Sequence, residues 1–250
     1  MDSKIAETIA EMDDVFETSV YEPVGEKLSD FEHIGIEASR HILREPTLSQ
    51  RVYLPFKRLF DIVFSLIALI AFLPVFIIVA ILIKIDSPGP AIFKQIRAGK
   101  GGMPFTVYKF RTMTVGADEQ RLKCEKFKNE TGPIRVTKGD SRITRLGKFL
   151  RNSTIDELPQ LMNILLGQMS IVGPRPFAMY EHERLSEYQK KRTLVKPGLT
   201  CYWQVNGRHL VDNDTRIEMD IQYTQENGFL IDMVLVLKTI PAVIRGKGAY

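Results

Sequence analysis

The sequence contains little cysteine, histidine or tryptophan, and these shortages argue against several classes of protein. Its 250 residues include two cysteines, four histidines and one tryptophan. Cys124 and Cys201 have no spacing typical of a disulfide framework or a metal site, so we expect reduced thiols facing the cytosol. His33 and His41 likewise lack metal-ligating neighbours. A zinc-organised domain and a disulfide-stabilised secreted domain are therefore disfavoured.

Long uncharged segments are also rare, and the sequence contains one of them, residues 62–83. This segment has 22 residues and no charged side chain. As an α-helix it would be about 33 Å long, which is enough to cross the hydrocarbon core of a bilayer. A buried core helix is the alternative, but the segment is long for the core of a small domain. A cleaved signal peptide is disfavoured because about 60 residues precede the segment.

Pro74 lies near the middle of this hydrophobic segment, where proline removes a backbone donor and bends a helix. Both flanks are basic, with Lys57 and Arg58 before the segment and Lys84 and Lys94 after it. Basic flanks favour the cytoplasmic face, and a straight crossing would carry one of them outside. We therefore interpret residues 51–86 as a membrane-inserted helix that is re-entrant at Pro74, with a single crossing as the alternative.

Residues 1–50 and the rest of the chain carry opposite net charges. The first 50 residues contain 12 acidic and 4 basic residues, whereas the remainder contains 30 basic and 18 acidic residues. We interpret residues 1–50 as a peripheral acidic extension with short helices at 5–16 and 31–43. A basic body beside a membrane suggests anionic lipid or phosphorylated substrates. Nucleic acid is not expected as a partner, because the membrane anchor fits it poorly.

Residues 87–250 are predicted to form one mainly helical domain of the α+β class, seated on the cytoplasmic membrane surface. Strands at 91–93 and 105–110 flank a basic, glycine-rich turn, which indicates a β-hairpin with a weak resemblance to a phosphate-binding loop. Helices are expected at 117–129, 178–193 and 213–227. Residues 229–244 are apolar but contain Asp232, Lys238 and Pro241, which favours an amphipathic helix lying on the membrane.

Two single residues of this domain have open interpretations. His182 falls on the polar helix predicted at 178–193, where we expect an exposed side chain. Trp203 is the only tryptophan of the chain. It could face either the membrane or a nucleotide, since its ring has an apolar body and a polar N–H group.

The acidic pair Asp156–Glu157 follows a strongly basic stretch, residues 135–151. Pro159 is expected to mark the start of a helix, because proline is tolerated where the backbone donor has no helical partner. Thr154 and Glu157 also fit a capping box, which would give the acidic pair a purely structural role. The basic setting favours a role in chemistry instead.

Further cations could accompany the acidic pair. Lys109 and Arg111 fall on one face if their strand continues. Arg175 is held in a Pro-Arg-Pro sequence, which restricts the backbone and suits the presentation of a guanidinium group to phosphate.

Several segments together resemble one family, the bacterial sugar transferases, which are monotopic polyprenyl-phosphate phosphoglycosyltransferases. The resemblance covers roughly residues 54–250 and rests on five segments in family order: Lys57–Asp61, Tyr108–Met113, Asp156–Gln160, Gly173–Pro176 and Pro197–Arg208. One departure is Leu73 before Pro74, where some members have serine. The resemblance implies transfer of a sugar 1-phosphate from a UDP-sugar to undecaprenyl phosphate, with magnesium, and release of UMP.

The same resemblance implies roles for single residues. Asp156 would be the covalent nucleophile, and Glu157 would take part in catalysis and bind Mg²⁺. The implied phosphate- and substrate-binding residues are Lys109, Arg111, Arg151, Arg175, Gln204, Asn206 and Arg208. The implied location is the cytoplasmic face of the bacterial inner membrane, in the first membrane step of exopolysaccharide, capsule or O-antigen synthesis, and a homodimer is compatible with it.

Elementary chemistry agrees with this implication, because two anionic substrates need cations to hold them and a carboxylate can form an acyl phosphate. The final residues, 248–250, are similar to those of members that use galactose or glucose. A UDP-N-acetylhexosamine donor, a magnesium-dependent lipid-diphosphate phosphatase and a non-catalytic basic scaffold on the membrane surface remain as alternatives.

Overall fold

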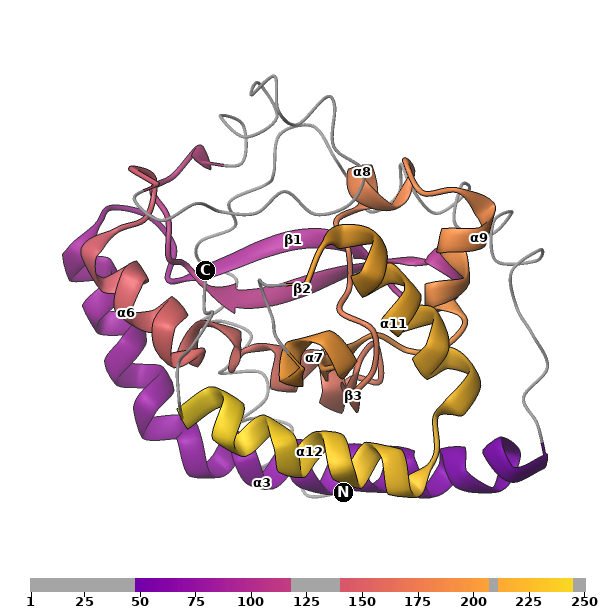
Figure 1. The fold of residues 1–250 in the computed structure, drawn as a ribbon. Helices are drawn as coiled ribbons and strands as arrows, with labels where there is room; N and C mark the ends of the chain where they lie inside the picture. Colours follow the sequence, from indigo (N-terminus) through magenta and orange to yellow (C-terminus); the bar gives the residue numbers. More distant parts are fainter. Residues whose placement is uncertain (1–47, 118–139, 207–210, 245–250) are drawn as a thin grey trace.

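A computed structural model describes residues 48–117, 140–206 and 211–244 (Figure 1). The helices predicted at 5–16 and 31–43 lie outside the described residues, as do nearly all of the helix predicted at 117–129 and the site residue Arg208. The described residues combine one long apolar helix with a mixed domain of short helices and small sheets. The predicted α+β class is confirmed at this level.

The hydrophobic segment belongs to one helix, α3 (Leu48–Asp86), of 39 residues with Pro55 and Pro74 in its interior. Figure 1 shows α3 running along the lower edge of the molecule and then turning upward at the left. Only 17% of its most apolar 18-residue window is buried. A core helix would hide that surface, so this exposure contradicts the core-helix alternative and fits a helix surrounded by lipid.

Charged and polar side chains before the apolar segment attach α3 to the domain. Lys57 forms an ion pair with Asp232 and donates to the Val172 carbonyl at 2.9 Å. Arg58 donates to the carbonyl groups of Ile164 and Leu165, which lie at the end of a helix in the domain. Lys57 and Arg58 therefore have a structural role, because they hold the start of α3 against the domain.

Asp61 completes this attachment from the next turn of α3. Its carboxylate accepts hydrogen bonds from the Ser170 hydroxyl at 3.1 Å and from the Ile171 backbone N–H at 2.9 Å. Asp61 is only 2% exposed. A buried carboxylate is tolerated when its oxygens are hydrogen-bonded, so Asp61 fixes the position of α3 against the domain.

The other end of α3 is attached to the same domain by Arg111. Its guanidinium group donates to the Ser87 carbonyl at 2.7 Å, to the Pro88 carbonyl and to the Ile83 carbonyl. A cation at the C-terminus of a helix satisfies free carbonyl groups and complements the helix dipole. Both ends of α3 therefore contact one and the same folded body.

The predicted hairpin is present, as β1 (Ile92–Ala98) paired antiparallel with β2 (Pro104–Phe110). Its first strand extends five residues further at its C-terminal end than the sequence predicts, because pairing continues up to the turn. The short 3-10 helix η1 (Lys100–Gly102) closes the turn, with Gly101 and Gly102 at positive φ. A second, parallel pair joins β3 (Ser170–Val172) to β4 (Gly198–Thr200).

Short helices surround these strands. They are α6 (Arg145–Ser153), η2 (Ile155–Glu157), α7 (Gln160–Leu165), α8 (Met179–His182), α9 (Glu187–Lys190), η3 (Lys191–Thr193), α10 (Tyr202–Val205), α11 (Asn213–Glu226) and α12 (Phe229–Ile244). The main hydrophobic core joins α3, the hairpin, α6, α7, the β3–β4 pair and α12. The helices expected at 213–227 and 229–244 are confirmed.

The single helix predicted at 178–193 is wrong, because this stretch forms α8, then a break at residues 183–186, then α9 followed directly by η3. Ser186 caps α9 by accepting a hydrogen bond from the Gln189 backbone N–H, which starts a new helix within the stretch. The expectation of an exposed His182 is also wrong. This side chain is 4% exposed, and its imidazole ring lies beside Gly102 of η1.

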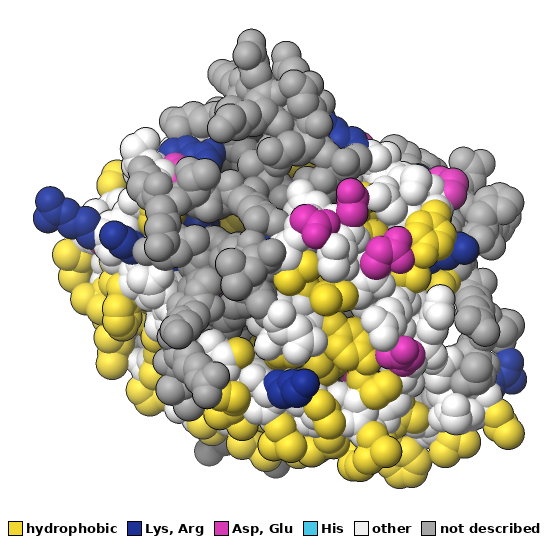
Figure 2. All heavy atoms as spheres, in the orientation of Figure 1, with side chains coloured by type: hydrophobic (Ala, Val, Ile, Leu, Met, Phe, Trp, Pro, Cys, Tyr) yellow, Lys and Arg dark blue, Asp and Glu magenta, His cyan; other side chains and the backbone are white. Residues whose placement is uncertain are grey.

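An apolar surface extends over α3 and α12. Figure 1 places α12 alongside α3, and Figure 2 shows hydrophobic side chains gathered along the lower and left edges of the molecule over these helices. The exposed large apolar side chains of α12 are Phe229, Leu230, Val234, Leu237 and Ile240. Such a continuous exposed surface is typical of contact with a membrane.

Candidate active site

The acidic pair occupies a tight turn between two helices. Thr154 ends α6 in the left-handed conformation, with φ 61°, and the 3-10 turn η2 then carries Asp156 and Glu157 to Pro159, which caps α7. The prediction that Pro159 marks a helix start is confirmed. The capping-box alternative is wrong, since the Thr154 side chain makes no capping hydrogen bond and Glu157 faces cations instead.

Glu157 is held by two cations from distant parts of the chain. Arg175 donates to both of its carboxylate oxygens, to Oε2 at 3.0 Å, and Lys109 of β2 donates to Oε1 at 3.1 Å. All three side chains are largely shielded from solvent. A two-pronged guanidinium–carboxylate contact fixes orientation as well as charge, so Glu157 is locked in place.

Asp156 is buried to a similar degree but has a different environment. Among the described residues, no hydrogen bond to its carboxylate is found, although its side chain is only 9% exposed. It lines a cavity of about 120 Å³ whose polar wall includes Lys109, Arg151 and Arg97. Because cations lie near Asp156 and no described residue donates a hydrogen bond to its carboxylate, this group is free to contact a ligand.

The pKa values of the two carboxyl groups are driven apart. Burial, reinforced by the charge of Glu157, raises the pKa of Asp156 to about 6, against the opposing effect of nearby cations. Burial acts on Glu157 too, but Arg175 and Lys109 outweigh it and hold the pKa of Glu157 well below its usual range. Adjacent acids with separated pKa values are typical of residues with different roles in one reaction.

The pKa of Lys109, which contacts Glu157, is also shifted. Burial, together with the positive charges of Arg175 and Arg97, lowers the pKa of Lys109 to about 8, and Glu157 acts in the opposite direction. The ammonium group still carries a proton at neutral pH. It is therefore a charged donor that a substrate phosphate can recruit.

The Pro-Arg-Pro segment is fixed through its backbone by two further arginines. Arg192 of η3 donates to the Arg175 carbonyl at 2.6 Å, and Arg97 donates to the Pro176 carbonyl at 2.6 Å. Arg192 is itself paired with buried Asp220. This support was missed by sequence reasoning, because Arg192 lies in a stretch whose charges resemble those of a solvated helix.

The remaining predicted site residues are spread over the domain. Arg151 lines the Asp156 cavity and donates from Nε to the Thr112 hydroxyl at 2.9 Å. Arg111 lines the same cavity, but its guanidinium group is turned toward the end of α3. The structure therefore brings Lys109, Arg151 and Arg175 to the acidic pair and gives Arg111 an architectural contact.

Two predicted site residues of the C-terminal segment, Gln204 and Asn206, do not line the Asp156 cavity. The Gln204 side-chain oxygen accepts from the Cys201 thiol at 3.0 Å. Asn206 lines a separate cavity beside α12 and is absent from the wall of the Asp156 cavity. Trp203 is buried under the guanidinium group of Arg216 at 4.7 Å, so neither the membrane-facing nor the nucleotide-facing interpretation fits.

The fit of a divalent cation can be judged from the carboxylates alone. In the part of the chain that the structure describes, no group of three or more metal-ligating side chains is found. Mg²⁺ commonly uses only one or two protein carboxylates, together with water and substrate phosphate oxygens. The adjacent carboxylates of Asp156, on the cavity wall, and Glu157, next to it in the chain, supply that number, so the donor set fits a cation that arrives with a phosphorylated substrate.

Comparison with known proteins identifies a matching family and several similar proteins. The family described as bacterial sugar transferase matches residues 52–246. The exopolysaccharide production protein ExoY of Sinorhizobium fredii is 40% identical over 200 residues, which cover 78% of this chain and 88% of that protein.

Two larger relatives match over a similar stretch. The UDP-glucose:undecaprenyl-phosphate glucose-1-phosphate transferase of Klebsiella pneumoniae is 39% identical over 203 residues. The galactosyl transferase CpsE of Streptococcus agalactiae is 40% identical over 194 residues. The matched regions cover 41% and 43% of these two proteins, so the chain corresponds to less than half of their length.

Proposed function

Because the chain belongs to the bacterial sugar transferase family, we propose that it transfers a sugar 1-phosphate from a UDP-sugar to undecaprenyl phosphate and releases UMP. The observation that carries this proposal is the contrast within the acidic pair. Glu157 is held by Arg175 and Lys109, whereas Asp156 lines the cavity with no hydrogen-bond partner among the described residues. A buried carboxylate in that state is suited to act as a nucleophile.

The reaction would take place in two displacements at phosphorus. A carboxylate oxygen of Asp156 attacks the phosphorus that bears the sugar, and the bond from that phosphorus to the bridging oxygen breaks. UMP leaves with the bridging oxygen and its electron pair. An oxygen of undecaprenyl phosphate then attacks the same phosphorus, and the bond to Asp156 breaks, which restores the carboxylate.

The cations of the site would hold the anionic groups in place. Arg175 and Lys109 already form a fork around an oxyanion, that of Glu157, and a substrate phosphate offers them similar oxygens. Arg151 lies on the cavity wall near Asp156. Phosphoryl transfer depends mainly on positioning and on offsetting negative charge, and these residues can supply both.

Mg²⁺ is part of this proposal. Glu157, with Asp156 beside it, would hold the ion, which would neutralise charge on the diphosphate when bound. For this to occur, Arg175 and Lys109 must share Glu157 with the ion or move toward the substrate phosphates. Lys109 is already part of the cavity wall, and Arg175 is linked to it through their shared contact with Glu157.

The lipid acceptor fits the membrane contact of the molecule. We place α3 in the cytoplasmic leaflet as a re-entrant helix, because Lys57 and Arg58 attach its start to the domain and Arg111 attaches its end. A helix that crossed the bilayer could not have both ends on one folded body. The Asp156 cavity then faces the cytoplasm close to lipid head groups at the inner membrane.

The donor is proposed to be UDP-glucose or UDP-galactose, because the similar proteins from Klebsiella pneumoniae and Streptococcus agalactiae are named for glucose 1-phosphate and galactosyl transfer. The pathway is proposed to be exopolysaccharide synthesis, as in the name of ExoY, with capsule or O-antigen synthesis as alternatives. A homodimer is compatible with the proposal, which does not depend on it.

The test is incubation of the purified full chain with each of several UDP-sugars, undecaprenyl phosphate and Mg²⁺. Lipid-linked sugar and UMP in equal amounts are the expected products, formed from UDP-glucose or UDP-galactose faster than from UDP-N-acetylhexosamines. Free phosphate released from a lipid diphosphate would instead identify a phosphatase. If well-folded protein in a membrane formed no product with any donor, the result would favour a non-catalytic scaffold on the membrane surface.

A further inference from the structure

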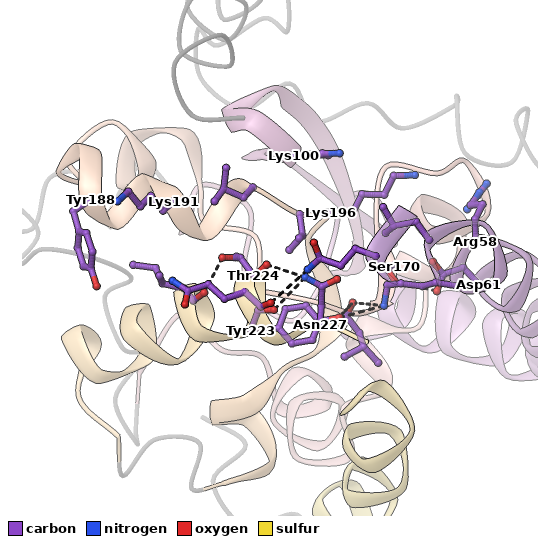
Figure 3. Close-up of a pocket in the computed structure, with 18 of the residues that line it drawn as sticks. Arg58, Asp61, Lys100, Ser170, Tyr188, Lys191, Lys196, Tyr223, Thr224 and Asn227 are labelled. Atoms are coloured by element: carbon purple, nitrogen blue, oxygen red, sulfur yellow. Dashed lines mark hydrogen bonds between the residues drawn. The ribbon is translucent and has the colours of Figure 1, made fainter. Parts of the chain in front are cut away.

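A second cavity, distinct from the one at Asp156, lies beside the first part of α3. Its volume is about 670 Å³, which is within the range of ligand-binding sites. Figure 3 shows Arg58 and Asp61 on one side, Tyr188 and Lys191 on the opposite side, and Lys100 above. Neither Asp156 nor Glu157 nor Arg175 lines it. The reaction proposed above therefore gives this cavity no role.

Basic side chains from separate elements converge on this cavity. The five cations of its wall are Lys57, Arg58, Lys100, Lys191 and Lys196. Its two carboxylates are already engaged, since Asp61 accepts hydrogen bonds from Ser170 and Ile171 and Glu187 pairs with Lys190 at 2.8 Å. Five cations against two carboxylates therefore leave an excess of positive charge in the cavity, of which Asp61 offsets a part.

Some of the cations also have partners within the protein. Lys57 is paired with Asp232, Arg58 donates to helix carbonyl groups, and Lys191 lies over the Tyr188 ring at 5.1 Å. By contrast, Lys100 and Lys196 form no hydrogen bond or ion pair with any residue in the described part of the chain. These two ammonium groups remain available to a ligand.

Lys196 is also close to another cation. Its Nζ atom and the Arg58 guanidinium group both lie within 4 Å of the position that a Cβ atom would occupy at Gly167. Burial lowers the pKa of Lys196, as do the charges of Arg58 and Lys100, while Asp61 opposes them. Crowding of like charges is relieved when an anion binds between them.

The position of the cavity indicates the kind of anion. Leu54, Lys57, Arg58 and Asp61 of α3 line it, and the uncharged membrane segment starts at the next residue, Ile62. With α3 inserted as proposed above, the cavity is level with the head groups of the leaflet that holds this helix. Basic pockets beside membrane helices on the cytoplasmic side are suited to acidic head groups.

We propose that this cavity binds the phosphate group of an anionic phospholipid, with Lys100 and Lys196 as its principal contacts. Free phosphate shares this chemistry, but the position beside the membrane segment favours the lipid. Lys100 lies in the glycine-rich turn between β1 and β2.

The test measures lipid binding to the full chain in detergent by native mass spectrometry, with phosphatidylglycerol as the probe and phosphatidylcholine of the same chain length as comparison. The variant Lys100→Gln/Lys196→Gln removes both contacts. Lys84→Gln/Lys148→Gln is the matched control, because it removes the same charge from two exposed lysines outside the cavity. Circular dichroism verifies that both variants are folded.

Wild-type protein should prefer phosphatidylglycerol, and Lys100→Gln/Lys196→Gln should weaken its binding by about tenfold or more, whereas the control should retain it. Equal losses in the two variants, or no loss in either, would overturn the proposal. A further arm adds inorganic phosphate. Suppose that phosphate raises the unfolding temperature of the wild type but not of Lys100→Gln/Lys196→Gln, and that phosphatidylglycerol binds no better than phosphatidylcholine. The cavity would then bind free phosphate, and the assignment to a lipid would be wrong.

Discussion

Two charged segments of this protein look alike in sequence and differ in the structure. Lys57, Arg58 and Asp61 precede the membrane segment, and each has partners that satisfy its charge. Asp156 and Glu157 lie in a similar mixture of charges, yet Asp156 has no hydrogen-bond partner among the described residues. Because buried charges are normally paired, we assign the first segment to the attachment of α3 and the second to the active site.

The largest effect is expected from Asp156→Asn. Asparagine keeps the size of the side chain but lacks the anionic oxygen, so turnover should fall by about a thousandfold or more, as for loss of other covalent nucleophiles. Lipid-linked sugar formed from a labelled UDP-sugar measures the change. A variant that retained a tenth or more of wild-type activity would contradict the assignment.

Stability provides the control for this variant. The raised pKa of Asp156 means that the folded protein disfavours the ionised carboxyl group, so this group lowers stability as the pH rises from 3.8 to about 6, and the full cost is present above that range. Asp156→Asn removes that cost, and its unfolding temperature at pH 7.5 should equal or exceed that of the wild type. A clear decrease would indicate a structural role for Asp156.

At the attachment of α3 we expect a loss of stability with little loss of activity, which is the opposite of the result expected for Asp156→Asn. Lys57→Met leaves the Asp232 carboxylate buried and without its cation, which should lower the free energy of unfolding by about 3 kcal/mol. The chemistry of the protein that remains folded should be largely preserved. Thermal unfolding in detergent and activity per folded molecule measure the two effects, and inactivity at full stability would be inconsistent with an architectural role.

A smaller loss of activity is expected from Arg175→Lys. Lysine keeps the charge but cannot make the two-pronged contact with Glu157, so the rate should fall by about tenfold to a hundredfold. Glu157→Gln should also be impaired, through weaker metal binding, and excess Mg²⁺ should restore part of its activity. Steady-state rates at several Mg²⁺ concentrations separate these two variants, and an unchanged Arg175→Lys would remove Arg175 from the site.

The mildest test changes pH instead of a residue. If ionised Asp156 is the nucleophile, kcat/KM should be half of its plateau near pH 6 and about a tenth of it near pH 5, since the pKa of this group is raised to about 6. An acidic limb near pH 4 would correspond to an ordinary exposed aspartate. The rates are measured at a Mg²⁺ concentration far below saturation, because a bound cation would itself lower the pKa of Asp156, and at constant ionic strength.

Much of the fold follows from local patterns. The uncharged segment, the strand–turn–strand pattern and the apolar helix at 229–244 each depend on neighbours in the sequence, and each was predicted. The helix predicted at 178–193 was wrong because tertiary contacts divide it, as the packing of α8 against β1 illustrates. The burial of His182 has the same cause.

The site was predictable in its residues but not in its contacts. Motif resemblance identified Asp156, Glu157 and Arg175, and the structure brings them together. No sequence pattern indicated that Arg192 supports the backbone of Arg175, because that contact joins separate elements. Nor did the sequence distinguish the paired Arg111 at the end of α3 from cations available to a substrate.

The most direct test of the central claim is a search for the covalent intermediate. The full chain is incubated with UDP-sugar labelled in the sugar, in the presence of Mg²⁺ and the absence of lipid acceptor, and then denatured. We predict label bound to wild-type protein, mapped by mass spectrometry to Asp156, released UMP in equal amount, and no label on Asp156→Asn. Equal labelling of the two proteins, or wild-type turnover without bound label at any time, would contradict a nucleophilic Asp156.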